Sequence, residues 1–269
     1  MGTIKYRKPP ITERAVSFGF TLPEEDFQRK ISSWSDIVRD VFPHSKIANQ
    51  WQISIADKDG VPFIPKENQK FTTKYQFWEG NNKRWDHGIQ VWSDRVTFNL
   101  IGGLQSPRTY EDLKLFHDEW LPRWADYFCV TELHGATLEY VNLLTESTIP
   151  SFCKDERISI GQILSAFVTP GPIKALVPPF SFDMNFEDQR HEVPIRFHAG
   201  LSTIPNPKIS LKLLFRASTE VLGRKISIDH VQQEIDTCHA VILEEFEAFF
   251  TTEAKNSFEP YDADTTKHE

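Results

Sequence analysis

The stretch Lys208–Arg216, KISLKLLFR, alternates apolar and polar residues with a period of two. One side of this alternation carries Ile209, Leu211, Leu213 and Phe215, and the other carries Lys208, Ser210, Lys212, Leu214 and Arg216. Successive side chains of a strand point to opposite faces of a sheet, so the pattern predicts a strand with one buried face and one basic face.

The strand predicted before it, over residues 191–199, repeats this arrangement. Val193, Ile195 and Phe197 alternate with Arg196 and His198. We therefore expect Arg196, His198, Lys212 and Arg216 to share the face of the sheet that is turned away from the core. This shared face is the first candidate for a binding surface.

A hairpin over residues 88–101 is predicted earlier in the chain, with its turn at Ser93-Asp94. If it joins the same sheet, Trp92 adds an aromatic ring to the basic face, together with the amides of Gln90 and Asn99. A helix follows, with Thr109 as its N-cap, and it should run to residue 128. Pro122 lies inside this span and predicts a kink or a break into two helices.

The beginning of the chain predicts a strand and then a helix. Residues 12–20 alternate, with Arg14, Val16 and Phe18 on a bulky side and Glu13 among small residues on the other. Acidic residues after Pro23 favour a helix start, and the apolar spacing continues to Phe42. Strands are also expected at 51–55, 71–78, 136–144 and 176–186, and a long amphipathic helix at 228–250.

These elements predict an α+β fold with two lobes of antiparallel sheet backed by long helices. The N-terminal lobe covers residues 1–145, and the C-terminal lobe covers residues 180–251. Between them, residues 146–179 are rich in proline and hold only a short helix at 158–167. Residues 252–269 are expected to form a flexible acidic tail.

Composition limits the functional classes. The 269 residues carry a net charge of -8, which disfavours non-specific binding to nucleic acid, although a local basic face remains compatible with it. Three cysteines without close spacing predict neither a disulfide framework nor a zinc site, and they indicate a reducing cytoplasm. The N-terminus has no apolar segment typical of a signal peptide or a membrane span.

Motifs for cofactors and catalysis are missing from the sequence. It contains no phosphate-binding loop, no GxGxxG and no GxSxG, so we predict no cofactor. Pairs such as Asp86-His87, His117-Asp118 and Asp229-His230 never reach the HExxH spacing, so no metal site is predicted. Glu13 could act as a base, but we interpret it and Arg14 as parts of the scaffold, and we expect His239 to be a packed or capping histidine.

Several short motifs carry a family resemblance: Lys8–Glu13, Phe42-Pro43, Arg95–Asn99, Trp120 and Leu138–Asn142. With these motifs the chain resembles an uncharacterised, sporadically distributed family of prokaryotic proteins of similar length. The resemblance implies no particular activity, and it makes a role in mobile elements or phage defence conceivable. Arg14 departs from the family pattern, in which a small residue is expected.

The sequence thus favours a non-enzymatic binding protein that uses the face defined by Arg196, His198, Lys212, Arg216 and Trp92. Its partner would be another protein or an anionic ligand, and an exposed Trp92 also allows a homodimer. The alternative is a hydrolase or nuclease whose carboxylates and histidines come together from distant segments. An ordinary solvated sheet face is the remaining interpretation of the same pattern.

Overall fold

The fold is seen in a computed structural model of the whole chain. The structure describes residues 4–6, 9–53, 56–58, 61–63, 69–81, 84–102, 108–146, 148–149, 152–154, 157–158, 160–165, 181–188, 195–204, 210–220 and 224–262.

One nine-stranded antiparallel sheet forms the centre of the fold, with the strand order β13-β14-β15-β10-β2-β8-β7-β6-β3. Its strands from the N-terminal part of the chain are β2 (Ile11–Gly19), β3 (His44–Ile53), β6 (Gln69–Asn81), β7 (Arg84–Val91), β8 (Arg95–Ile101) and β10 (Ala136–Leu144). Those from the later part are β13 (Ser181–Asp188), β14 (Ile195–Ile204) and β15 (Ser210–Ser218).

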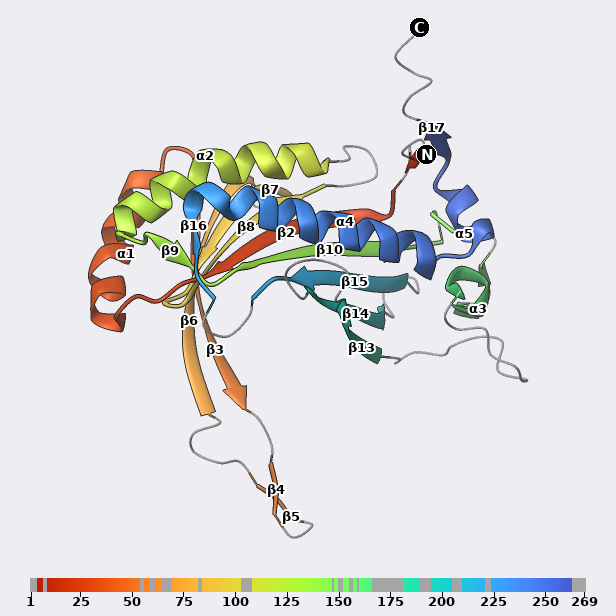
Figure 1. Cartoon of the computed structure of the whole chain (residues 1–269), viewed down its shortest axis with the longest axis horizontal. Helices are drawn as coiled ribbons and strands as arrows, with labels where there is room; N and C mark the ends of the chain where they lie inside the picture. Colours follow the sequence, from red (N-terminus) through yellow and green to blue (C-terminus); the bar gives the residue numbers. More distant parts are fainter. Residues whose placement is uncertain are drawn as a thin grey trace, which may run out of the picture.

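Three long helices cover one face of this sheet, as Figure 1 shows. They are α1 (Glu24–Val38), α2 (Tyr110–Phe128) and α4 (Val231–Phe249). Helix α4 packs on β10 and β15, and α2 packs on β2 and β8 and also against α1. The sheet and these helices confirm the predicted α+β class.

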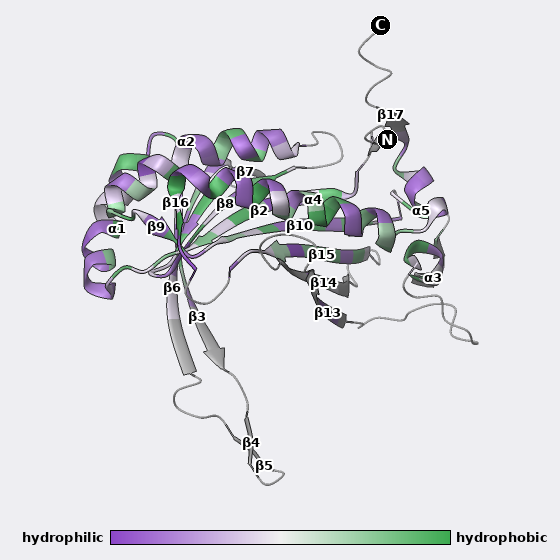
Figure 2. Ribbon diagram, viewed as in Figure 1, coloured by the Kyte–Doolittle hydropathy of each residue, from purple (hydrophilic) through white to green (hydrophobic). Residues whose placement is uncertain are grey.

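The hydrophobic core fills the layer between the helices and the sheet, where hydrophobic residues gather in Figure 2. Val16 and Phe18 of β2 are fully buried there, and so are Leu211 and Phe215 of β15. Burying such a side chain contributes about 1.5 to 3 kcal/mol, so this layer fixes which face of each strand turns inward. The alternation read from the sequence therefore decides the orientation of both strands, as predicted, although Ile209 lies outside the described residues.

Helix α2 begins with a capping box, because the Thr109 side chain accepts a bond from the backbone of Asp112, whose carboxylate binds the Thr109 backbone in return. The predicted N-cap is therefore confirmed. The predicted break at Pro122 is wrong, because one helix of 19 residues runs through this position. Pro122 is exposed, so its ring lies on the solvent side, away from the core.

Strands from both predicted lobes share the single sheet. β10 from the N-terminal lobe pairs with β15 from the C-terminal lobe over Thr137–Leu144. The proline-rich connection between the lobes includes the short elements β11 (Cys153–Lys154), β12 (Arg157–Ile158) and α3 (Ile160–Ile163). Helix α3 is shorter than the helix predicted at 158–167, whose last residues lie outside the described part.

The segment predicted to be a flexible tail begins with ordered structure instead. Residues 252–257 form α5 (Thr252–Ser257), and β17 (Pro260–Asp262) pairs with β1 (Ile4–Tyr6). Phe258 is fully buried against the ring of Tyr6, and this apolar anchor is the reason why the segment folds back. Residues 263–269 lie outside the described part of the chain.

The smaller remaining elements are β4 (Ala56–Lys58) paired with β5 (Val61–Phe63), β9 (Glu132–Leu133) paired with β16 (Ile226–Ser227), and the 3-10 helix η3 (Ile228–His230). Among the helices that the structure describes, none combines the length and the apolar character needed to cross a bilayer.

Candidate binding groove

The face of the sheet opposite the helices is hollowed into a groove of about 790 Å³. We call it the groove, and its lining residues are Glu13, Ala15, Ser17, Thr72, Gln90, Trp92, Asp94, Arg95, Thr97, Asn99, Thr137, Glu139, Val141, Asn185, His198, Lys212, Leu214, Arg216, Ser218 and Glu220. This volume lies in the range of sites that hold small ligands and cofactors.

The floor of the groove is made of short hydroxyl side chains on the central strands. Ser17 on β2 and Thr97 on β8 are hydrogen-bonded at 2.8 Å, and Thr137 on β10 bonds Ser218 on β15 at the same distance. These four residues lie in one row across the sheet, because Ser17 is opposite both Thr97 and Thr137, and Thr137 is opposite Ser218. These short side chains leave space above the middle of the sheet, and the longer side chains around them form the walls of the groove.

The neighbouring row carries charges that neutralise one another. Arg216 donates from Nε to a carboxylate oxygen of Glu139 at 2.7 Å. Next to this pair, His198 Nδ1 lies 3.0 Å from Oδ1 of Asn185, and its Nε2 lies 3.3 Å from a carboxylate oxygen of Asp183. Arg216 and His198, two of the predicted binding residues, therefore already contact partners within the sheet.

A second ion pair lies at another side of the groove. The Arg95 guanidinium contacts both carboxylate oxygens of Glu220, at 3.1 and 3.0 Å. Gly19 lies beneath this pair, and a Cβ at this position would be 3.1 Å from the Glu220 carboxylate. The glycine thus gives the pair the space to form.

Lys212 in the groove and Lys74 beside it lack such a partner among the described residues. Lys212 is exposed, and among the residues that the structure describes it forms no ion pair. Lys74 of β6 holds its ammonium group 5.4 Å from the centre of the Trp92 ring. Burial and the nearby Lys46 lower the pKa of Lys74, and within the described part of the chain it too has no ion-pair partner.

Glu13 faces the groove between these two lysines. Burial raises the pKa of its carboxyl group, and the nearby Glu139 raises it further, while Lys212 and Lys74 lower it. No hydrogen bond or ion pair to the Glu13 carboxylate occurs among the described residues. β8 and β7 lie between β2 and β6, so Lys74 acts on Glu13 across two intervening strands.

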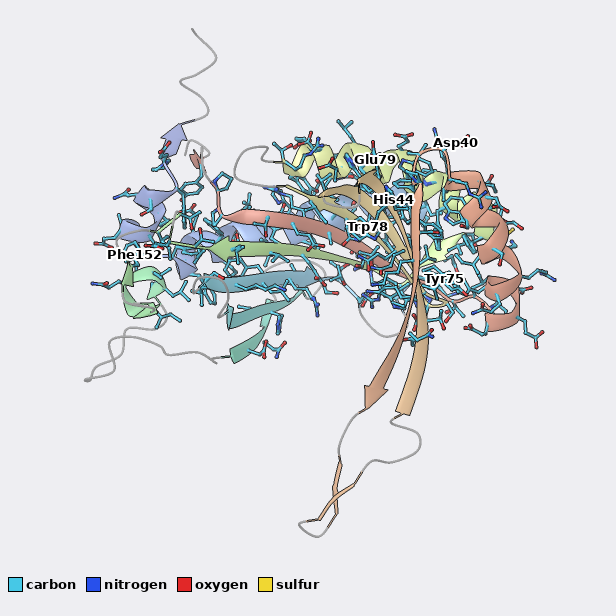
Figure 3. The ribbon with its side chains drawn as sticks, turned by 180° about the vertical axis from the view of Figure 1, so that it is seen from behind. Asp40, His44, Tyr75, Trp78, Glu79 and Phe152 are labelled. Carbon is cyan, nitrogen blue, oxygen red and sulfur yellow. The ribbon has the colours of Figure 1, made fainter. Side chains whose placement is uncertain are left out.

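Asn99 of β8 leaves a hydrogen-bond donor unused on the groove floor. Its side chain is 97% buried, and its Nδ2 has no partner among the described residues. Gly88 of β7 is its cross-strand neighbour, and the ring of Trp78 covers this glycine so closely that a Cβ there would be 2.1 Å from the ring. Figure 3, which views the molecule from behind, labels Trp78 on β6 together with Tyr75 and Glu79 of the same strand.

The structure brings four of the five predicted binding residues together, since Trp92, His198, Lys212 and Arg216 all line the groove. The backbone of Arg196 lies in β14 opposite Ser218, but its side chain falls outside the described residues. The face is not purely basic as expected, because Glu139 on the neighbouring strand β10 neutralises Arg216, and Glu220, just after the end of β15, neutralises Arg95.

Sequence reasoning did not single out the acidic groove residues Glu139 and Glu220, and it placed Asn99 on this face without predicting that its donor would be unpaired. The alternation of β10 placed Glu139 on the outer face, so this residue could have been found once the strand order was known. The interpretation of Glu13 as scaffold also changes, because its side chain lines the groove whereas Arg14 is buried on the helix side.

The predicted histidine and acid pairs do not assemble a metal site. No group of three or more potential ligands from His, Cys, Asp and Glu occurs within the residues described here. His117 is a residue of α2 and is fully buried, next to the ring of Phe18 on β2. His239 stacks on Tyr110 at 3.8 Å and bonds the Tyr140 hydroxyl at 2.7 Å, which confirms that it is a packed histidine.

Comparison with known proteins identifies no family. No model of a known protein family matches the sequence, and no curated protein matches it either. Among solved structures, the chain aligns with the S. pombe Pct1 RNA triphosphatase, solved in complex with the Spt5 CTD, at 6% identity. The alignment covers 91% of this chain and 83% of that one, but its TM-score of 0.14 is too low to support any inference.

Proposed function

We propose that this protein binds a small organic anion in the groove, with Lys74 and Lys212 as its anchoring cations. The observation that carries the proposal is that Lys212 lines the groove and Lys74 lies over the ring of Trp92 at its edge, both without an ion-pair partner among the described residues, while Arg95 and Arg216 are neutralised. A phosphate or carboxylate group would give each ammonium group the partner that it lacks, and such charge-assisted bonds are about twice as strong as neutral ones.

The floor of the groove supports the same proposal for the uncharged part of the ligand. Asn99 offers a buried donor, and donors that stay unpaired in a low-dielectric site cost about 1 to 3 kcal/mol. A ligand with a carbonyl or hydroxyl oxygen would remove this penalty. The ring of Trp92 provides an apolar surface at the edge of the same site.

A small ligand fits better than a long polyanion. Glu13, Asp94, Glu139 and Glu220 all line the groove, and the last two already occupy its arginines, so a chain of phosphates would meet carboxylates along its whole length. The net charge of -8 also disfavours the binding of a polyanion. We therefore favour a ligand with one or two anionic groups over a nucleic acid.

Phenyl phosphate is a suitable first probe, because it joins an anionic group to an aromatic ring. We expect Lys212→Met and Lys74→Met each to weaken its binding at least about fivefold, the effect of losing one ion pair of roughly 1 kcal/mol in a partly solvated site. Lys225→Met is the matched control, since Lys225 is exposed and pairs with Glu132 outside the groove. Equal weakening by the control, or none by the two groove variants, would contradict the proposal.

A hydrolase is the second candidate function, and the protected carboxyl group of Glu13 favours it. A carboxyl group whose pKa is raised by burial is suited to general acid catalysis. The test is turnover of p-nitrophenyl phosphate and bis(p-nitrophenyl) phosphate by the wild type and by Glu13→Gln. Turnover that the variant abolishes would replace the binding proposal with the enzymatic one.

A further inference from the structure

We propose that Glu13 sets the specificity of the groove: an anion binds beside its carboxyl group when one hydrogen lies between the two groups. Phosphate monoesters that still carry a hydrogen would be preferred over sulfate esters, which have none. This inference rests on the proposed function, because it concerns the ligand of the same site.

The argument starts from the position of Glu13 among the charges of the groove. Glu13 lines the groove together with Lys212 from β15 and Glu139 from β10, and Lys74 from β6 lies over the ring of Trp92, another residue of the lining. Arg14, its neighbour on β2, is buried on the opposite face. An anion that Lys212 holds in the groove therefore comes close to the carboxyl group of Glu13.

Two anionic groups in contact repel each other unless a hydrogen lies between them. With one hydrogen, the contact becomes an O–H···O⁻ bond, which is short and strong. The hydrogen can come from Glu13 or from the ligand. Burial and the nearby Glu139 raise the pKa of Glu13, so the site itself favours the protonated contact.

Phosphate and sulfate esters differ in whether they can supply this hydrogen. A phosphate monoester loses its second proton with a pKa of about 6, so it carries a hydrogen below that pH. A sulfate ester has the same single charge but no hydrogen. It can bind well only when Glu13 itself is protonated, and its affinity should therefore rise as the pH falls towards the pKa of Glu13.

The matched probes are phenyl phosphate and phenyl sulfate, titrated at pH 6.0 into the full-length protein with ligand-observed NMR. We expect the wild type to bind the phosphate about tenfold more tightly, the equivalent of one hydrogen bond to a charged group. Glu13→Gln should bring the two affinities within about twofold of each other, because its carboxamide can donate to either anion. Glu253→Gln on α5, outside the groove, should keep the preference of the wild type.

The outcomes separate this inference from the proposed function. If neither probe binds the wild type, both fail. If both probes bind the wild type and Lys212→Met weakens their binding, the groove binds anions. If the wild type then shows no preference between the probes and Glu13→Gln changes nothing, only the role of Glu13 is wrong. A second measurement on the wild type alone is the pH dependence of phenyl sulfate binding, and an affinity unchanged between pH 7.5 and 5 would also overturn the inference.

Discussion

Arg14 and Glu13 are neighbours in the sequence, but they belong to two different environments. Arg14 is buried under α2 and α4, where its guanidinium lies 5.3 Å from the centre of the Tyr140 ring. Burial lowers the pKa of this arginine, while Tyr140 and Asp112 support its charge. The Tyr140 hydroxyl also bonds His239, so a single oxygen serves two buried groups.

Tyr140→Phe removes that oxygen and nothing else. We expect it to lower the free energy of unfolding by about 2 to 3 kcal/mol, because Arg14 and His239 both lose a partner in a buried site. Urea unfolding at pH 7 measures the change. Tyr127→Phe is a useful control, since its hydroxyl binds only the Lys30 carbonyl near the surface. A loss no larger than that of the control would show that Tyr140 does not hold this cluster together.

Two histidines make the fold sensitive to acid. Burial lowers the pKa of His117 and of His239 from 6.5 to about 4. The unfolded chain therefore takes up protons first, so the contribution of these two histidines to stability is complete above pH 6.5, is lost as the pH drops towards 4, and changes no further below that value. The slope is roughly 1.4 kcal/mol per pH unit for each histidine.

His117→Phe should reduce this acid sensitivity. Neither ring nitrogen of His117 forms a hydrogen bond among the described residues, and the nearest acid to Nδ1 is the exposed Asp118 at 3.3 Å, so phenylalanine removes only this contact and leaves no buried group to protonate. Unfolding free energies between pH 7 and pH 4.5 check the prediction. If the variant loses as much stability over this range as the wild type, protonation of His117 does not cause the acid sensitivity.

At the scale of elements, the sequence pattern predicted correctly which face of a strand is buried, but it predicted less well whether a helix is continuous. The alternation of β2 and β15 placed Phe18 and Phe215 in the core, because burial of large apolar side chains dominates the orientation of a strand. Pro122 misled the prediction for α2, because the packing of the Trp120 and Trp124 side chains keeps the helix continuous. Tertiary packing here overrides a local preference.

Pro122→Ala should therefore stabilise the protein. Proline inside a helix removes one backbone hydrogen bond and costs up to about 3 kcal/mol relative to alanine, whereas the exposed position has no packing to lose. We expect the free energy of unfolding to rise by about 1 to 2 kcal/mol in a urea titration. An unchanged or lower value would mean that the proline ring packs favourably or that the helix gains no bond.

The groove shows what single elements cannot reveal. Trp92, Lys212 and Arg216 were predicted from the alternation of their own strands. The pairing of Arg216 with Glu139 depends on β15 and β10 being neighbours, and no local pattern states that order. The influence of Lys74 on Glu13 depends on the order β2-β8-β7-β6, so it too lay beyond the sequence.

At the scale of the molecule, the shared sheet joins the two lobes that the sequence predicts. β10 is hydrogen-bonded to β2 on one side and to β15 on the other. Separating the lobes would expose a central strand edge and the apolar layer below α4. The α+β class and the helix positions followed from the pattern, but the order of the strands required the structure.

We therefore expect one cooperative unfolding transition. Thermal unfolding followed by near-UV and far-UV circular dichroism should give the same midpoint, because both lobes depend on the β10–β15 pairing. Two separated midpoints would show that the lobes fold independently despite the common sheet. Lys225→Met, outside both the sheet and the groove, should leave the midpoint unchanged.

The central claim is that the face of the sheet opposite the helices binds an anionic ligand, and the side-chain amide signals of two asparagines test it directly. Asn99 lies on the groove floor, whereas Asn142 is equally buried but does not line the groove. In a ¹⁵N NMR titration with phenyl phosphate, we predict that the Asn99 side-chain signal shifts with saturation while that of Asn142 stays in place. A fixed Asn99 signal at saturating ligand, or an equal shift of both, would contradict the account.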